Sequence, residues 1–170
     1  NTLYDGLNIH VGFHPHNNMG IAVANAYMAV KEGATIIDGT LRGFGAGAGN
    51  CQLEDLVALL EKSGIKTGID FYRMLDASDN VMPGIMEKEM GQDSVSIVSG
   101  QAGVFSAFKI HVLKAAEEFH VDPRDILVEL GRRKAVGGQE DLVVEIAEKL
   151  GGDNGKSSTV NINYHLESLL

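Results

Sequence analysis

The chain has 170 residues, 44% of them hydrophobic, which is enough for one globular domain with a substantial core and argues against a disordered chain. Its formal net charge is -9, and the acidic residues are spread along the chain, so we expect no basic surface for nucleic acid. The only cysteine, Cys51, excludes an internal disulfide and is typical of a reducing compartment, from which we predict a cytoplasmic protein.

The sequence carries no membrane or targeting signal. No run reaches the roughly 18 to 20 apolar residues that span a bilayer, and no basic stretch followed by an apolar one opens the chain. The chain starts at Asn1 without methionine, and a strand pattern follows within about ten residues. We therefore expect it to be part of a longer polypeptide.

Residues 1–68 alternate between strand and helix patterns. β-Branched and aromatic residues mark the strands, one-face apolar spacing marks the helices, and glycines end both helices. This order predicts parallel strands joined by helical crossovers. The expected elements are a strand at 7–13, a helix at 19–30, a strand at 34–38, a glycine-rich loop at 43–50 and a helix at 52–63.

A histidine pair ends the first predicted strand, in the run GFHPHNN at residues 12–18. Residues two apart on a strand point to the same side, so His14 and His16 can share one cation. Pro15 between them is poorly tolerated inside a sheet, which places the pair where the ladder ends. The alternative is a pair of loop histidines, with one of the following asparagines capping the next helix.

Two histidines are too few for a catalytic metal site, which normally has a third protein ligand and an open position. No nearby carboxylate offers itself in the sequence as that ligand. We therefore expect the third ligand to come from elsewhere in the intact protein.

The glycine-rich loop follows a strand and opens a helix, so its backbone amides can approach an anionic or carbonyl ligand. Neither the P-loop lysine nor the GxGxxG spacing is present. Asn50 at its end either faces a site or caps the helix that follows. The glycines near the expected site are Gly45, Gly47 and Gly49. Arg42, beside the loop, is expected either to bind an anionic substrate or to be solvated.

From residue 69 to 150 the patterns are helical. The expected helices are 70–82, ended before Pro83, then 104–119, 122–130, ended by Gly131, and 139–150. His111 lies on the apolar face of the second of these and is expected to be a core histidine. Residues 151–170 form a separate segment, with linker composition to 158 and alternating apolar residues at 160–166.

Four runs of sequence resemble the C-terminal half of the bacterial 4-hydroxy-2-oxovalerate aldolases, a branch of the superfamily that includes 3-hydroxy-3-methylglutaryl-CoA lyase. In chain order they are GFHPHNNMGIAVANA, DGTLRGFGAGAGNCQLEDLV, AGVFSAF and DILVELGRRKAVGGQED. The resemblance covers nearly the whole chain to about Leu150.

The resemblance implies an α/β fold that is the C-terminal part of a TIM (β/α)8 barrel, with residues 1–68 as its late strands and helices, followed by a small all-helical domain. His14 and His16 would bind Mn2+, or another divalent metal such as Mg2+ or Co2+, together with an aspartate from the first barrel strand. Asn50 is a weaker metal ligand candidate. The catalytic arginine and histidine of the family would lie in the N-terminal half, so this chain carries no catalytic residue and is expected to be inactive alone.

The implied reaction is cleavage of a 4-hydroxy-2-oxo acid to pyruvate and an aldehyde in aromatic hydrocarbon catabolism. Phe105 stands where the aldolases usually have a tyrosine that borders the substrate, and it either lines the substrate pocket or packs within a helix. The implied partner is an acylating acetaldehyde dehydrogenase, docked on the helical region with its run ELGRRKAVGGQED, in an oligomer. The alternative for Arg132 to Lys134 is a solvated cationic run at a helix C-terminus. A CoA-dependent lyase or Claisen-type synthase, or a non-catalytic scaffold for the dehydrogenase, remain alternatives.

Overall fold

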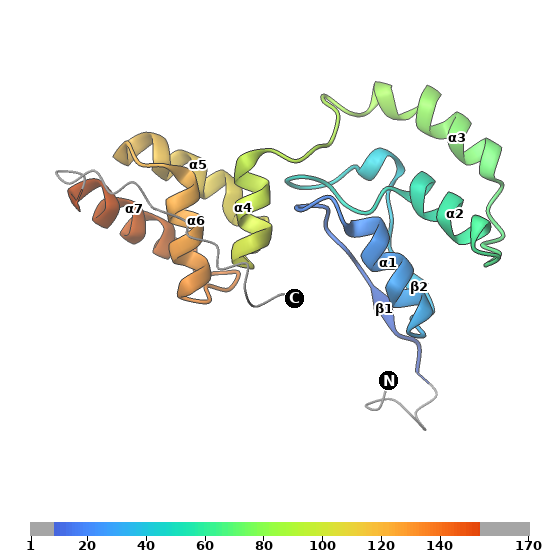
Figure 1. Cartoon of the computed structure of the whole chain (residues 1–170). Coiled ribbons are helices and arrows are strands. Elements are labelled where there is room, and N and C mark those ends of the chain that lie inside the picture. Colours follow the sequence, from blue (N-terminus) through green and yellow to red (C-terminus); the bar gives the residue numbers. More distant parts are fainter. Residues whose placement is uncertain (1–8, 154–170) are drawn as a thin grey trace, which may run out of the picture.

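The computed structural model describes residues 9–153 as an α/β unit and a cluster of four helices (Figure 1). Two residues of the first predicted strand and the alternating segment 160–166 lie outside the described residues. The predicted α/β class is confirmed for residues 9–62, while most of the remaining described chain is helical.

Two short parallel strands form the sheet of the α/β unit. Gly12 pairs with Ile36 and Phe13 with Ile37, and a helix connects the strands, as the sequence predicted. Both flanking helices are followed by glycines with left-handed backbone, at φ 99° for Gly33 and 80° for Gly64. The elements are β1 (Gly12–Phe13), α1 (Ala22–Lys31), β2 (Ile36–Ile37), η1 (Leu41–Gly43) and α2 (Leu53–Lys62).

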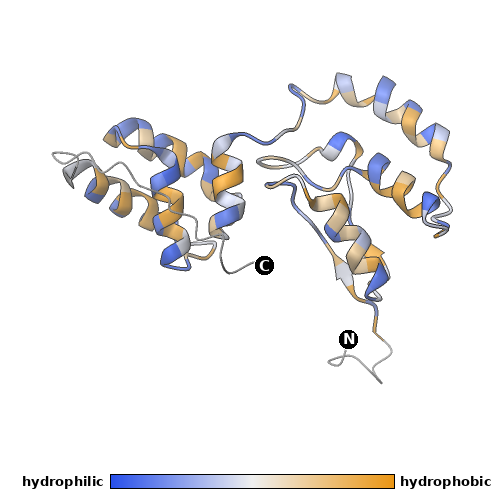
Figure 2. Ribbon diagram, in the orientation of Figure 1, coloured by the Kyte–Doolittle hydropathy of each residue, from blue (hydrophilic) through white to orange (hydrophobic). Residues whose placement is uncertain are grey.

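The α/β unit has a small core between α1 and α2. Its apolar residues recur on one side of each helix, and Figure 2 shows hydrophobic and hydrophilic residues alternating along both. Burial of these side chains is the main stabilising contribution. The buried members are Ala22, Ala26, Cys51, Leu56 and Leu60.

Next in the chain, α3 (Phe71–Asn80) packs against α2 rather than against the helical cluster. Asp70 begins it by accepting a hydrogen bond from the Arg73 amide at 3.1 Å. The helix ends before η2 (Met82–Gly84), which contains Pro83, as the sequence predicted. Our sequence-based division placed residues 69–80 with the helical region; in the structure they extend the α/β unit.

Four helices make the second unit: α4 (Ser94–Ala102), α5 (Phe108–Phe119), α6 (Pro123–Arg132) and α7 (Asp141–Asp153). The sequence predicted the last three but missed α4, because serine, valine, isoleucine and glycine are weak helix formers. α7 also includes residues 151–153, which we had assigned to the linker. The fully or nearly buried core residues are Val104, Phe108, Val112, Ala115, Ala116, Ile126, Leu127, Leu130, Val143, Ile146 and Ala147.

The helix predicted at 104–119 begins only at Phe108, and its buried apolar face is narrower than expected. Phe108, Val112 and Ala115 are buried, whereas His111 is exposed. The prediction of a core histidine at 111 is therefore wrong. The polar ring lies outside the apolar stripe that packs on α6 and α7.

Gly131 does not end α6, which runs on to Arg132. The glycine lies where α6 crosses α4: a Cβ built on it would stand 2.3 Å from the carbonyl oxygen of Ala102 and 2.9 Å from its Cβ. The missing side chain lets the two helix backbones approach closely. Packing, rather than helix termination, is the reason for this glycine.

An ion pair joins the start of α4 to α5. Asp93 caps α4 through the Ser96 amide at 2.7 Å, and the Lys109 ammonium reaches both the Asp93 carboxylate at 2.7 Å and the Ser96 hydroxyl at 2.8 Å. Burial alone would raise the pKa of Asp93, but Lys109 and the Ser96 hydrogen bonds lower it to about 2.

The low pKa of Asp93 predicts an acid-dependent stability. The folded-state pKa lies below the usual value, so this stabilisation is present above pH 3.8 and is lost as the pH falls toward 2. We expect Lys109→Met to lower the urea midpoint at pH 5 and to flatten its decline between pH 4 and 2. The exposed Lys114→Met on the same helix is the control; equal curves for both variants would contradict the prediction.

No helix within residues 9–153 combines the length and apolar character that crossing a membrane requires.

Candidate metal centre

The two predicted ligands, His14 and His16, lie together just beyond the end of β1. Their ring centroids are 5.1 Å apart and their planes meet edge to face at 76°. His14 Nδ1 is 3.0 Å from Oδ2 of Asp38, the residue after β2, and half of each of these two side chains or more is exposed. The structure therefore brings both rings to one accessible place.

The spacing of the rings fits two ligands of one ion. With metal–nitrogen bonds of about 2.1 Å, imidazole centroids lie about 3.2 Å from the metal, and about 4.6 to 5.3 Å from each other for angles between octahedral and tetrahedral. The 5.1 Å separation falls within that range. Within residues 9–153 no group of three histidine, cysteine or carboxylate side chains is placed to hold a metal ion.

Backbone hydrogen bonds join the glycine-rich loop to residues 14–18, which carry the two histidines and are called the histidine turn below. The Asn17 amide donates to Gly49 O at 2.8 Å, and the Cys51 amide donates to Pro15 O at 3.1 Å. His16 and Asn50 form an antiparallel bridge between these two bonds. The metal candidates His16 and Asn50 are thus held side by side by their backbones.

Some backbone amides of this loop are used in hydrogen bonds within it. The Gly49 amide donates to Ala46 O and the Asn50 amide to Gly43 O, at 3.0 and 2.8 Å. Gly49 must be glycine here: its φ is 89°, and a Cβ would stand 2.2 Å from Gly43 O. The loop is therefore internally hydrogen-bonded at its end and joined by its backbone to the segment that carries the two histidines.

Asn50 does not cap the following helix, which begins at Leu53 without a side-chain cap. Its amide nitrogen donates to Phe44 O at 3.1 Å, and its Oδ1 is buried with no hydrogen-bond partner among the described residues. The side chain lies over Gly45, where a Cβ would come within 2.4 Å of it. The unpaired amide oxygen keeps Asn50 a candidate for a weak metal ligand near His16. Gly47, in the same loop, faces Ser106.

An open cavity of about 420 Å³ adjoins His16. Phe105 is on its rim and is 54% exposed, so its ring is available to a ligand rather than packed inside a helix. Apolar and polar side chains from both units face this space. The lining residues are His16, Asn18, Met19, Ile21, Asn25, Ser99, Gly100, Gly103, Val104, Phe105 and Ser106.

The turn that carries His16 is tied directly to the helical cluster. Asn18 donates to Ser96 O at 3.3 Å and accepts from the Ser106 hydroxyl at 3.3 Å, and the Gln92 amide nitrogen donates to Asn17 O at 3.0 Å. In Figure 1 the histidine turn and the glycine-rich loop both reach toward α4. No local sequence pattern predicts this link, because its partners are more than 70 residues apart.

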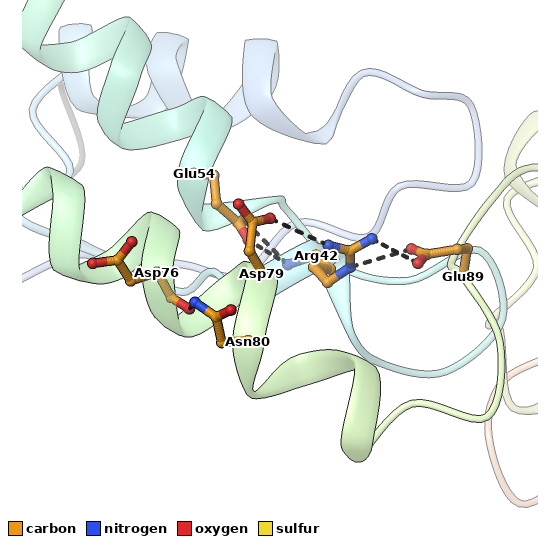
Figure 3. Close-up of polar contacts among 6 residues, drawn as sticks. All are labelled: Arg42, Glu54, Asp76, Asp79, Asn80 and Glu89. Atoms are coloured by element: carbon orange, nitrogen blue, oxygen red, sulfur yellow. Dashed lines mark hydrogen bonds and ion pairs between the residues drawn. The ribbon is translucent and has the colours of Figure 1, made fainter.

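Arg42 is neither solvated nor free for a substrate. Its guanidinium binds Glu89 at 2.6 Å and lies 3.7 Å from Asp79, while its backbone amide donates to the Glu54 carboxylate at 2.8 Å (Figure 3). The pairing with Glu89 raises the pKa of the guanidinium further. These contacts hold a left-handed residue, at φ 53°, and tie the segment after α3 to the glycine-rich loop.

Cys51 is adjacent to the site but takes no part in it chemically. Its thiol is fully buried, and burial together with Asp55 raises its pKa to about 11. A protonated, enclosed thiol is a poor nucleophile and a poor metal ligand.

The run from Arg132 to Lys134 is partly structural. Arg133 binds Glu129 on its own helix at 2.9 Å and Glu145 on α7 at 2.7 Å, and only 28% of its side chain is exposed. Arg132 also pairs with Glu129, and it is exposed. Arg133 therefore joins two helices, which leaves Arg132 and Lys134 as the accessible cations of this run.

Two family models match the chain in succession. Residues 1–81 match the family described as HMGL-like, and residues 90–151 match the DmpG-like communication domain. The division between the two falls in the segment after α3, where the structure changes from the α/β unit to the helical cluster.

The chain is similar to several curated proteins named 4-hydroxy-2-oxovalerate aldolase. The protein from Pectobacterium atrosepticum is 56% identical over 92% of this chain and 46% of its own length, and that from Pelotomaculum thermopropionicum is 52% identical over 91% and 45%. The chain is also similar to a crystal structure of the N-terminal domain of a putative aldolase from Bacteroides vulgatus, with a TM-score of 0.51 and 30% sequence identity. That match covers 57% of this chain and 32% of the other. The chain spans about half the length of the curated relatives it matches.

Proposed function

Since the chain belongs to the 4-hydroxy-2-oxovalerate aldolase family, with an HMGL-like segment before a DmpG-like communication domain, we propose that it is the C-terminal half of a divalent-metal aldolase. The α/β unit is then the late part of a TIM barrel, and an N-terminal half supplies the other strands. The substrate is a 4-hydroxy-2-oxo acid, cleaved to pyruvate and an aldehyde.

One observation carries the proposal: two imidazoles stand 5.1 Å apart beside an open cavity. His14 and His16 would hold the ion, Mn2+ or a similar divalent cation, with Asn50 as a weaker ligand. Bound there, such an ion acts as a Lewis acid that stabilises negative charge developing on the keto oxygen of the substrate. The substrate and residues of the N-terminal half would supply the remaining ligands.

The residues around the cavity bind and orient the substrate. Cleavage breaks the C3–C4 bond, the 4-hydroxyl proton goes to a base of the N-terminal half, and C3 takes up a proton to give pyruvate. Met19, Ile21 and Phe105 provide an apolar wall for the departing aldehyde and exclude water from it. The Phe105 ring supplies shape without a hydroxyl, so it orients substrate through packing alone.

The helical cluster is the proposed docking region for an acylating acetaldehyde dehydrogenase, which would consume the aldehyde. Residues 90–151 match a communication domain, and this unit contacts the cavity through Ser99 and Ser106. The assembled enzyme is proposed to be a cytoplasmic oligomer.

Pyruvate release tests the proposed reaction. In the presence of Mn2+, we expect the protein with both halves of the barrel to convert 4-hydroxy-2-oxovalerate to equal amounts of pyruvate and acetaldehyde, measured by coupled NADH oxidation. Residues 1–170 by themselves should release neither. Turnover of 3-hydroxy-3-methylglutaryl-CoA instead would establish the CoA-lyase alternative, and dehydrogenase binding without any pyruvate would establish a scaffold.

A further inference from the structure

Asp38 occupies a defined place beside the candidate metal centre. The parallel register pairs Phe13 with Ile37, so the next residue of each strand, His14 and Asp38, also lie side by side. The Asp38 amide donates to Phe13 O at 3.0 Å, which fixes its backbone. Its carboxylate then meets His14 Nδ1 at 3.0 Å.

This contact determines which nitrogen of His14 carries the proton. An ionised carboxylate can only accept hydrogen bonds, so the neutral imidazole must carry its hydrogen on Nδ1. The lone pair is then on Nε2, the nitrogen on the other side of the ring. The hydrogen bond also restrains rotation of the ring about its side-chain torsions.

We propose that Asp38 is a positioning residue, which holds His14 in the Nδ1–H form and aims its Nε2 at the metal. A carboxylate in this role both orients an imidazole ligand and makes it more basic. The part of the inference that concerns the metal rests on the proposed function, whereas the part that concerns the tautomer does not.

The same carboxylate does not fit a direct ligand as well. Oδ2 is engaged by His14, and a metal bound at Oδ1 would have to share the group with the imidazole. His16, in contrast, has no side-chain hydrogen bond within residues 9–153, and its ring lies edge to face with that of His14. Asp38 thus fixes one ring, and that ring packs against the other.

The tautomer can be measured without metal. In the metal-free protein with both halves of the barrel and ¹⁵N-labelled histidine, we expect His14 to be mostly in the Nδ1–H form and Asp38→Ala to shift it toward Nε2–H, the form that free imidazoles favour. Thr35→Ala is the matched control, because Thr35, just before β2, makes the equivalent 3.0 Å contact with Nδ1 of His10, which precedes β1. An unchanged His14 spectrum in Asp38→Ala would overturn the assignment.

Metal affinity tests the consequence. By calorimetry with Mn2+ we expect Asp38→Ala to weaken binding by about 10- to 100-fold, the usual cost of losing such a partner. Asp38→Asn keeps an oxygen acceptor for Nδ1–H and should recover most of that loss, while Thr35→Ala binds as the wild type. If Asn and Ala were equally damaging, Asp38 would be a ligand and not a positioning residue.

The two experiments also separate this inference from the proposed function. A shifted tautomer together with no Mn2+ binding in the wild type would reject the metal aldolase and leave the Asp38–His14 pair standing. Wild-type Mn2+ binding with an unaffected tautomer would reject the positioning role alone.

Discussion

Replacing His14 or His16 with alanine is expected to weaken Mn2+ binding by at least about 100-fold, because even the loss of a residue that only supports a ligand costs about 10- to 100-fold. The ring centroids are 5.1 Å apart, a spacing that suits two ligands of one ion, and no third histidine, cysteine or carboxylate among the described residues completes a cluster with them. Calorimetry on the protein with both halves of the barrel measures the affinity, and pyruvate release should fall with it.

His10→Ala provides the control for that loss. His10 is an exposed histidine on the same part of the chain, bound to Thr35 and remote from the pair, so its removal changes the histidine content without touching the site. We expect wild-type affinity for this variant. Unchanged binding in both His14→Ala and His16→Ala would remove the basis for the proposed lyase chemistry.

Gly131→Ala is expected to lower the free energy of unfolding by about 1 to 3 kcal/mol, the usual cost of overpacking. The new methyl group would stand 2.3 Å from Ala102 O, a backbone atom that cannot turn aside, so α4 and α6 must separate. Urea unfolding monitored by circular dichroism gives the value.

Gly152→Ala is the matched control for this packing effect. Gly152 is also in a helix, but a Cβ there meets nothing within 4 Å. Alanine has the higher helix propensity, so we expect no loss, or a gain of up to about 1 kcal/mol. A loss of stability at Gly152 as large as at Gly131 would show that contact with Ala102 is not the cause.

The elements best predicted from the sequence are those whose own residues determine them. α2 combines one-face apolar spacing with a following glycine, and it was found to within one residue at each end. α4 was missed because it depends on contacts from outside: the Asp93 cap, the Lys109 ion pair and close packing on Gly131. Gly131 was misread as a helix end for the same reason, since nothing local distinguishes a packing glycine from a stop.

At the site, the strand period correctly indicated that the two histidine rings would lie together. Asp38 was not identified, although it stands at the end of the second predicted strand. Recognising it requires the register of β1 and β2, which one sequence does not provide. No local sequence pattern predicts the hydrogen bonds that join Asn17 to Gln92 and Asn18 to Ser96.

Those links have a mechanical consequence. A swing of the helical cluster about the segment between η2 and α4 would break the bonds of Asn17 and Asn18 at once, and Gly100 sits so close to Asn18 that a Cβ would come within 2.9 Å of it. Any force that a bound protein exerts on α4 therefore acts on Asn18, two residues from His16. The candidate metal centre and the helical cluster are therefore mechanically coupled through a short stretch of chain.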